Sequence, residues 1–314
     1  MIFFNSIYAN LPDAFYQHVQ PSASINPKLI TINKKLANFL NIDIKNKKLI
    51  TQIFSGKFIS NGSKPIAMAY AGHQFGNFVP MLGDGRAILL GEIKGKDNLF
   101  YDIHLKGSGK TRFSRNGDGR CPLGPAVREY LLSEAINNLK IPTTRSLAIL
   151  STGETILREH TMPGAILVRV ASSHVRVGTF EYFSFKKDYK NLKILADFCI
   201  KRYFPDLEKK KDKYLLFFFE VLKKQIKLVS KWLSIGFIHG VMNTDNTSIF
   251  GETIDYGPCA FMDCFQKKRV FSSIDYMGRY SYGNQSSICL WNMVCFANAI
   301  LPLFKDQKST AKIL

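Results

Sequence analysis

The stretch MLGDGRAILLGEIKGKDNLFYDIHLKGSGKT, residues 81–111, decides the fold. A glycine-rich loop at 83–86 leads into an apolar run at 87–93, and this pattern predicts a loop followed by a strand. After a turn, residues 101–106 alternate between apolar and polar side chains, which predicts a second, half-buried strand that ends in Lys106. A glycine loop, a strand and a strand lysine follow one another in this order in the N-lobe of protein kinases.

The segment GSGKT at 107–111 looks like the end of a phosphate-binding P-loop, but two observations exclude a P-loop. The pattern requires a glycine five residues before Gly109, and this chain has His104 there. The P-loop lysine also opens a helix, whereas a polar segment broken by glycines follows Lys110. We therefore expect a surface turn in this segment.

Two helices are predicted, one of them from its apolar spacing. The segment PAVREYLLSEAINNL at 125–139 has helical periodicity, and Pro125 suits its first turn. This helix carries Glu129 near its start, so a helix glutamate follows the strand lysine along the chain, as in a kinase N-lobe. A second helix is expected at 218–235.

The segment GFIHGVMNTDNTSIFGETIDYGP at 236–258 supplies what a kinase-like second half needs. Asp245 and Asn246 lie in a predicted loop, and residues 247–254 read as two short strands around a glycine. Asp255 then opens a D-Y-G sequence where kinases have D-F-G. Carboxylate and amide oxygens are hard ligands that suit Mg²⁺.

The same segment departs from an ordinary kinase at the position of the base. Kinases carry H-R-D-L-x-x-x-N, whereas this chain carries HGVMNTDN, in which Val241 stands where kinases have the catalytic Asp and Asn243 follows two positions later. Asp245 remains in the loop and could lie near a hydroxyl group. Arg169 and Arg176 could grip the far end of a triphosphate, because a guanidinium matches phosphate geometry.

Composition limits the possible partners. The chain has 314 residues and a formal net charge of +19, which raises the possibility of nucleic-acid binding. The lysines, however, fall mostly at 186–231, where a solvated face explains them, while the arginines gather among glycines at 86–176. This distribution favours a small phosphate-bearing ligand over nucleic acid.

Targeting signals and metal motifs are not recognisable in the sequence. The six cysteines are scattered without a C-x-x-C pair, which suggests buried thiols in a reducing compartment, and the dispersed histidines do not suggest a transition-metal site. No secretory signal is evident and no apolar run approaches the ~18 residues of a membrane span. We expect a cytoplasmic protein without a membrane partner.

Several long stretches resemble the selenoprotein O family of kinase-like proteins. The matching stretches are YAGHQFGNFVPMLGDGRAILLGE (70–92), DIHLKGSGKTRFSRNGDGRCPLGPAVREYLLSEA (102–135), STGETILRE (151–159), ASSHVRVGTFEYF (171–183), IHGVMNTDNTSI (238–249) and IDYGPCAFMD (254–263). The resemblance implies a protein adenylyltransferase, which moves AMP from ATP to Ser, Thr or Tyr hydroxyls of target proteins with Mg²⁺ or Mn²⁺. It also implies that ATP lies inverted relative to ordinary kinases.

The resemblance also assigns roles to residues. Asp245 would be the general base, Asn246 and Asp255 would bind the metal, and Glu129 would pair with Lys106 and hold it in place. The residues implied to contact ATP are Gly83, Gly85, Arg86, Lys106, Asp118, Gly119, Arg169, Arg176 and Asp255.

Each of these residues also has a structural alternative. Lys106 could be a solvated strand end, Asp118-Gly119 a plain turn, Arg169 and Arg176 members of structural ion pairs, Asp245-Asn246 a helix cap or Asx-turn, and Asp255 a turn residue. His73 and His239 lie inside matching stretches and are expected to be structural.

We predict an α+β, bilobal, kinase-like fold. Residues 1–59 would pack on the core as an N-terminal segment, 60–180 would form a sheet-containing N-lobe, and 181–314 a mostly helical C-lobe. Family members continue past the position of Leu314, and the final KDQKSTAKIL lacks a plausible closing helix. We therefore expect an incomplete C-lobe in a chain that is a fragment, a decayed gene product or an authentic short form. A truncated, catalytically impaired, nucleotide-binding pseudokinase is the alternative function.

Overall fold

The computed structural model describes residues 2–305, which form two compact units. Unit 1 contains Met1–Ala69 and Leu82–His174, and unit 2 contains Tyr70–Met81 and Val175–Leu314. Residues 70–81 therefore form a short excursion into unit 2. The chain then returns to unit 1 at Leu82 and passes into unit 2 again at Val175. The predicted division at residues 59 and 180 stays a prediction.

Unit 1 is built on an eight-stranded antiparallel sheet in the order β1-β3-β6-β7-β10-β9-β2, and β8 also pairs with β10. The strands are β1 (Tyr16–His18), β2 (Lys28–Ile32), β3 (Ile66–Met68), β6 (Ala87–Lys94), β7 (Phe100–Lys106), β8 (Cys121–Pro122), β9 (Arg145–Leu157) and β10 (Thr161–Ala171). Strands β6 and β7 confirm the two strands predicted around the glycine loop.

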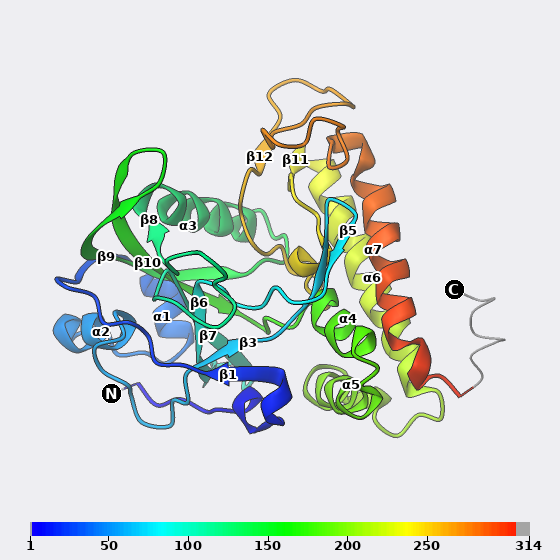
Figure 1. Cartoon of the computed structure of the whole chain (residues 1–314), viewed down its shortest axis with the longest axis horizontal. Helices are drawn as coiled ribbons and strands as arrows, with labels where there is room; N and C mark the ends of the chain where they lie inside the picture. Colours follow the sequence, from blue (N-terminus) through cyan, green and yellow to red (C-terminus); the bar gives the residue numbers. More distant parts are fainter. Residues whose placement is uncertain (1, 306–314) are drawn as a thin grey trace. The chain divides into compact units, whose positions relative to one another are not determined.

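Helices cover both faces of this sheet (Figure 1). Leu105 and Val168 belong to the apolar core that α1 (Lys34–Phe39) and α2 (Lys47–Phe54) close, whereas Leu167 packs with Ala126 of α3 (Leu123–Asn138). Adjacent residues of a strand point to opposite faces, so α3 lies on the face opposite α1 and α2. The helix predicted at 125–139 is confirmed, and it begins two residues earlier.

The prediction that β7 is half-buried is wrong. Asp102, His104 and Lys106, which alternate with the apolar core residues, are buried as well. They share the α3 face, because His104 pairs across the ladder with Arg169 and cross-strand partners share a face. Each of these polar side chains forms a hydrogen bond or ion pair with another buried polar side chain, and this pairing offsets the cost of burying it.

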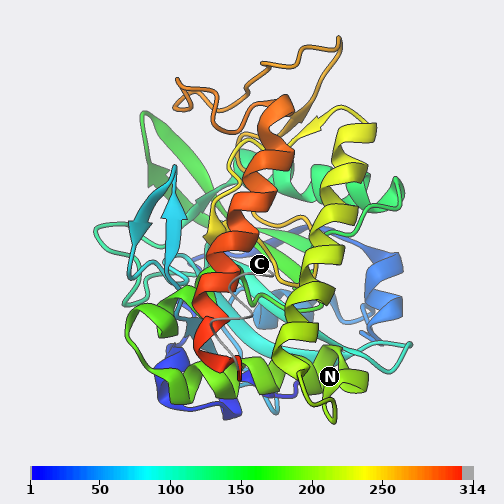
Figure 2. The same cartoon turned by 90° about the vertical axis from the view of Figure 1, so that its right-hand side faces the viewer.

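Unit 2 is mostly helical, as predicted. Its helices are α4 (Val177–Phe185), α5 (Tyr189–Tyr203), α6 (Lys213–Ser234) and α7 (Gln285–Ile300), with α6 and α7 side by side (Figure 2). The predicted helix at 218–235 is part of α6. Aromatic rings fill the core, where the Phe296 ring lies 5.0 Å from Phe180 and 5.8 Å from Phe217.

Short elements complete unit 2. Two-stranded pairs are formed by β4 (Gly72–Gln74) with β5 (Asn77–Val79) and by β11 (Phe237–Ile238) with β12 (Ala260–Phe261). Among residues 2–305 of both units, short 3₁₀ helices lie at Tyr8–Asn10, Asp13–Phe15, Pro205–Leu207, Thr244–Asn246, Tyr282–Asn284 and Leu301–Leu303.

The two strands predicted at 247–254 are not formed. Ser248 instead makes an isolated bridge with Arg176, and the Val177 amide donates to the Thr247 carbonyl at 2.9 Å. Gly251 has a φ of +69° and turns the chain away. The segment therefore pairs with a distant part of unit 2 instead of with itself.

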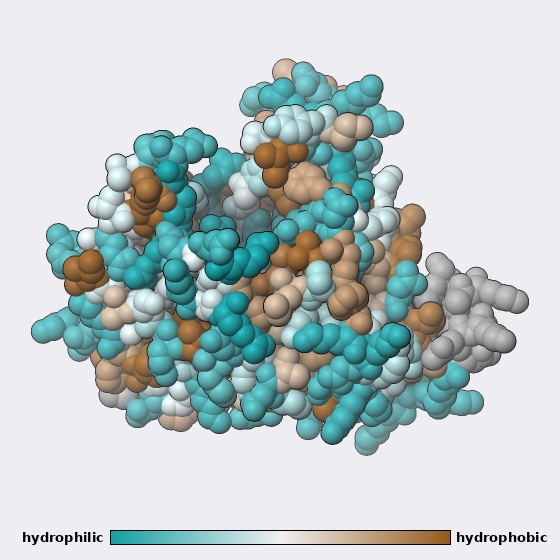
Figure 3. Space-filling model, in the orientation of Figure 1, coloured by the Kyte–Doolittle hydropathy of each residue, from teal (hydrophilic) through white to brown (hydrophobic). Residues whose placement is uncertain are grey.

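One helical stretch among residues 2–305, Tyr282–Leu303, is long and apolar enough by length and composition to cross a membrane. A core helix passes the same test, and the aromatic packing of Phe296 is that of a core residue. Hydrophilic residues predominate on the face drawn in Figure 3, with hydrophobic residues scattered among them. The predicted polar end of the chain lies outside the described residues from position 306 onward.

Candidate active site

Lys106, at the end of β7, belongs to a buried cluster of three charges in unit 1. Its Nζ lies 2.5 Å from Glu129 Oε2, and the other oxygen of Glu129 lies 2.6 Å from Arg169 Nε. Helix α3 and strand β10 supply these partners. The alternative of a solvated Lys106 is therefore wrong, and Arg169 does make an ion pair. Two cations share one carboxylate, so the cluster carries a net positive charge that suits a polyphosphate.

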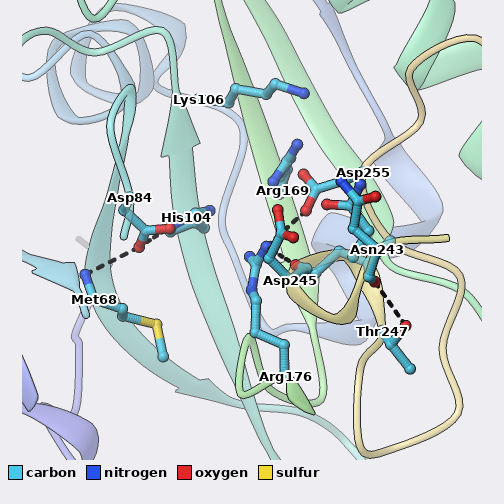
Figure 4. A network of polar contacts seen from close by, with 12 residues as sticks. Met68, Asp84, His104, Lys106, Arg169, Arg176, Asn243, Asp245, Thr247 and Asp255 are labelled. Atoms are coloured by element: carbon cyan, nitrogen blue, oxygen red, sulfur yellow. Dashed lines mark hydrogen bonds and ion pairs between the residues drawn. The ribbon is translucent and has the colours of Figure 1, made fainter. Parts of the chain in front are cut away.

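The glycine loop 83–86 is fixed to the sheet beside this cluster. Asp84 Oδ2 accepts a hydrogen bond from the Met68 amide at 3.1 Å and lies 3.0 Å from His104 Nε2 (Figure 4). Gly83 has a φ of +65°, and a Cβ there would lie 2.3 Å from the Phe113 ring. A side chain at this position would collide with Phe113, so the loop and the segment 107–120 could not pack this closely.

His104 also stacks on a second buried histidine, His174. The two rings lie 4.2 Å apart, and His174 Nδ1 lies 3.2 Å from Asp102 Oδ2. Burial, helped by the neighbouring His104, lowers the pKa of His174 to about 4. The ring is therefore neutral near pH 7 and donates to the Asp102 carboxylate through Nδ1.

Asp118 and Gly119 form a tight loop whose contacts are structural. Asp118 accepts two hydrogen bonds from Arg158, at 2.8 and 2.9 Å, and this pairing lowers the pKa of the Asp118 carboxyl. Gly119 has a φ of +69°, and the Gly109 amide donates to its carbonyl at 3.1 Å. Contact of either residue with ATP stays a prediction.

The segment after Lys106 is not a P-loop. Residues 107–120 form turns and bends, and the next helix, α3, begins only at Leu123. The prediction of a surface turn at 107–111 is wrong in part, because Gly107, Ser108 and Gly109 are buried and only Lys110 is exposed. Thr111 Oγ1 donates to the Asp84 carbonyl at 2.7 Å, so this segment braces the glycine loop. The Arg86 side chain, which was predicted to contact ATP, is exposed.

Arg176 joins the predicted base and metal ligand in unit 2. Its Nη1 donates to the Asp245 backbone carbonyl and to Asp255 Oδ2, both at 2.7 Å (Figure 4). The guanidinium is buried and lies 4.4 Å from the Tyr70 ring centroid. Segments that are 69 and 79 residues from Arg176 in sequence are thus held around one cation.

Asp245 has the surroundings of a general base. Burial raises the pKa of its carboxyl to about 6. Gln74 Nε2 donates to Oδ2 at 3.3 Å, whereas Oδ1 is buried without a hydrogen-bond partner in the described part of the chain. A carboxylate with a pKa near neutrality and an uncommitted oxygen is suited to take a proton from a hydroxyl group.

Asn243, two positions after the point where kinases carry the catalytic Asp, has a structural role. Its Oδ1 accepts hydrogen bonds from the Tyr280 hydroxyl at 2.6 Å and from the Phe75 amide at 3.2 Å. An amide group is also a very weak base, so Asn243 cannot replace the kinase aspartate.

Asn246 and Asp255 fit a hard divalent cation by the chemistry of their donors. Asn246 Nδ2 donates to the Val241 carbonyl at 3.0 Å, which orients the amide and leaves the oxygen as its ligand atom. Asp255 adds a carboxylate, and its φ of +60° places it in a rare backbone conformation for a residue other than glycine. Carboxylate and amide oxygen atoms are suitable ligands for Mg²⁺ or Mn²⁺.

The β4–β5 hairpin is the part of the site that the sequence analysis missed. The His73 amide donates to Thr244 Oγ1 at 2.7 Å, and Gln74 contacts Asp245 directly. A Cβ on Gly72 would lie 2.4 Å from Asp245 Oδ1, so only glycine allows this approach. The matching stretch YAGHQFG contained the signal, but its glycines and histidine suggested only structural roles.

The predicted site residues thus form two groups. Lys106 and Glu129 belong to unit 1, whereas Asp245, Asn246 and Asp255 belong to unit 2. Their predicted convergence on one metal-bound triphosphate stays a prediction.

Comparison with known proteins places the chain in a family. Residues 1–313 match the family described as Protein adenylyltransferase SelO. Proteins named Protein nucleotidyltransferase YdiU from Nitrobacter hamburgensis and Maridesulfovibrio salexigens are 53% and 51% identical to it, over 98% of this chain in each case. The chain spans 61% and 63% of the length of these two relatives.

A solved structure, ROP2 from Toxoplasma gondii, is described as having a protein-kinase fold and no enzymatic activity. It matches with a TM-score of 0.34 and 7% identity, over 74% of this chain and 68% of the other. The family match covers nearly every residue, and it agrees with the strand lysine, helix glutamate and D-Y-G segment found in the structure. This chain belongs to the protein adenylyltransferase SelO family.

Proposed function

We propose that this chain transfers AMP from ATP to Ser, Thr or Tyr hydroxyl groups of target proteins. The hydroxyl oxygen attacks the α-phosphorus, the bond from that phosphorus to the bridging oxygen of the β-phosphate breaks, and pyrophosphate leaves. The hydroxyl proton passes to the carboxylate of Asp245. ATP lies inverted relative to ordinary kinases, so the α-phosphorus and not the γ-phosphorus meets the hydroxyl.

The chain's residues divide this work. Lys106 and Arg169 bind phosphate oxygens, and Glu129 holds both cations in place. Asn246 and Asp255 hold Mg²⁺ or Mn²⁺, which supplies positive charge against the phosphates when it is bound. The remaining residues proposed to contact the nucleotide are Gly83, Gly85, Arg86, Asp118, Gly119 and Arg176.

One observation carries the proposal. Arg176 holds the backbone of Asp245 and the carboxylate of Asp255 at 2.7 Å each, so that a base with a raised pKa adjoins an oxygen-donor metal site. Phosphoryl-type transfers depend mainly on positioning and on charge stabilisation, and this arrangement supports both.

An ordinary kinase mechanism is disfavoured, because Val241 stands where kinases have the catalytic Asp and the nearby polar residue Asn243 cannot replace it. Its amide oxygen is committed to Tyr280 and Phe75, and it cannot take the hydroxyl proton. The alternative that remains is a nucleotide-binding pseudokinase, which would bind ATP without transferring any part of it.

The experiment compares ATP labelled at the α-phosphate with ATP labelled at the γ-phosphate. We expect the purified chain to label protein from α-labelled ATP in the presence of Mg²⁺ or Mn²⁺. Asp255→Ala should reduce this labelling by at least about 100-fold, because a metal ligand is lost. Asp263→Ala is the matched control, since Asp263 is an exposed carboxylate eight positions further on and should be dispensable.

Three results would decide otherwise. Label from γ-labelled ATP would identify an ordinary kinase. Thermal stabilisation by ATP without any labelling would identify the pseudokinase. Equal labelling by Asp255→Ala and wild type would remove the assigned mechanism.

A further inference from the structure

Three side chains that commonly bind metals lie together in unit 2. They are His73 of β4, Glu181 of α4 and Cys295 of α7, and one ligand atom of each lies within 4.8 Å of those of the other two. Cys295 has no part in the proposed AMP transfer. We propose that this cluster binds a zinc-type divalent cation, which accepts nitrogen, oxygen and sulfur ligands together.

The spacing of the ligand atoms is close to what such an ion needs. A tetrahedral Zn²⁺ ion with bonds of about 2.0–2.3 Å sets its ligand atoms roughly 3.3–3.8 Å apart. His73 Nδ1 and Glu181 Oε1 are 2.7 Å apart and hydrogen-bonded, so the ion replaces this bond after a separation of about 1 Å. Three protein ligands leave the fourth position for water.

The surroundings already orient two of the ligands. The His73 ring lies between Phe78 and Trp291, with ring centroids 4.9 and 5.1 Å away. The other oxygen of Glu181 accepts a hydrogen bond from Thr244 Oγ1 at 2.5 Å. Outer contacts of this kind fix ligand orientation in metal sites and reduce the entropy lost on binding.

Charge and access also fit a cation. Glu181 is 5% exposed and supplies a buried negative charge, while the His73 side chain is 24% exposed and gives a path from solvent. Burial, together with the charge of Glu181, raises the pKa of Cys295 to about 12, so the thiol is protonated without a cation. Binding therefore releases the thiol proton to solvent, and His73 binds as a neutral ring with its proton on Nε2.

This site is chemically distinct from the one proposed for Mg²⁺. Asn246 and Asp255 offer oxygen atoms only, which suit hard cations, whereas a thiolate selects softer ones. The cluster could not be predicted from sequence spacing, because His73 and Glu181 are 108 residues apart. The inference does not depend on AMP transfer.

Cobalt is the probe, because thiolate-bound Co²⁺ absorbs light through charge transfer. We expect the chelator-treated full chain to develop this absorption up to one equivalent of Co²⁺, and Zn²⁺ to abolish it. Cys295→Ser should lose the absorption. Two control variants should keep it: Cys289→Ser, a buried thiol on the same helix, and Cys264→Ser, an exposed thiol.

The inference is overturned if wild type gives no charge-transfer absorption or if the absorption survives in Cys295→Ser. It is also overturned if only Cys264→Ser loses the absorption, since the ion would then sit on the exposed thiol. Should Cys295→Ser fail to fold, His73→Gln provides the test, because loss of a ligand should weaken Co²⁺ binding at least about tenfold. Unchanged affinity in His73→Gln would overturn the proposal and leave AMP transfer untouched.

Discussion

The buried imidazole of His174 makes the stability of unit 1 depend on pH. Its pKa falls from 6.5 to about 4 in the folded protein, chiefly through burial. In the unfolded chain the ring takes up a proton below about pH 6.5, whereas the folded protein keeps it neutral until about pH 4. Above pH 6.5 the titration of His174 therefore does not change the free energy of unfolding. As the pH falls from 6.5 towards 4, the unfolded chain is increasingly stabilised by protonation of this ring, and the free energy of unfolding decreases.

We predict that a change from pH 7 to pH 5 decreases the free energy of unfolding by about 2 kcal/mol through the titration of His174. Urea unfolding curves of wild type and His174→Asn at both pH values measure this, since the asparagine amide can still donate to Asp102 but does not titrate. The variant should lose about 2 kcal/mol less than wild type. His160→Asn, at an exposed position, should behave as wild type. Identical pH dependence of His174→Asn and wild type would contradict the prediction.

Single residues also explain what the sequence could not reveal. The alternation along residues 101–106 placed Lys106 correctly at the end of a strand, yet it suggested a solvated polar face. That face is buried because Glu129, Asp84 and His174 come from other elements to pair with it. The alternation of apolar and polar residues predicts which side chains share a face of a strand. Whether the polar side chains on that face are exposed to solvent depends on tertiary contacts.

At the scale of elements, the β4–β5 hairpin holds the loop of the proposed base. Backbone amides of His73 and Phe75 donate to side chains of Thr244 and Asn243, on either side of the contact between Gln74 and Asp245. These contacts fix the loop from a segment that is 168–171 residues earlier in the chain.

We predict that Gly72→Ala slows AMP transfer roughly 100-fold, because the new methyl group would displace the Asp245 carboxylate by about 1 Å. Initial rates with α-labelled ATP provide the measurement, and thermal unfolding reports any general loss of structure. Gly124→Ala is the control, since a Cβ there meets open space. A normal rate in Gly72→Ala would mean that the base is elsewhere or that the hairpin does not position it.

Elements differed in how well sequence predicted them. The long helix α3 was found because many of its residues repeat at helical spacing. The three-residue strands of the hairpin are too short to display a period, and the predicted strands at 247–254 gave way to pairing of Ser248 with Arg176. Short strands take their partners from tertiary structure, which local sequence does not encode.

At the scale of the whole molecule, the excursion of residues 70–81 ties the two units together by connectivity. The amide of Ala69 donates to Phe15 within unit 1, whereas the amides of His73 and Phe75 donate within unit 2. Neighbours in sequence thus belong to different compact units. The boundary between residues 69 and 70 could not be predicted from the sequence, because the residues around it do not have the composition of a linker.

We predict that hydrogen exchange in the intact chain follows the units and not the sequence. With increasing denaturant, the amides of His73 and Phe75 should lose protection together with those of α6 and α7, while Ala69 should follow β6 and β7. Mass-spectrometric or NMR detection of individual amides provides the measurement. Exchange of residues 73–75 in step with Ala69 would contradict the division.

The excursion also means that the β4–β5 hairpin is synthesised well before the helices that it contacts. His73 leaves the ribosome 108 residues ahead of Glu181, which at about 5–20 residues per second is a delay of roughly 5–20 s. During that interval the nascent hairpin has none of its eventual neighbours from α4 or α7. Its sequence, GHQFGNFV, contains the apolar side chains Phe75, Phe78 and Val79, which stay without these neighbours during the delay, while its two glycines weaken its own tendency to form strands.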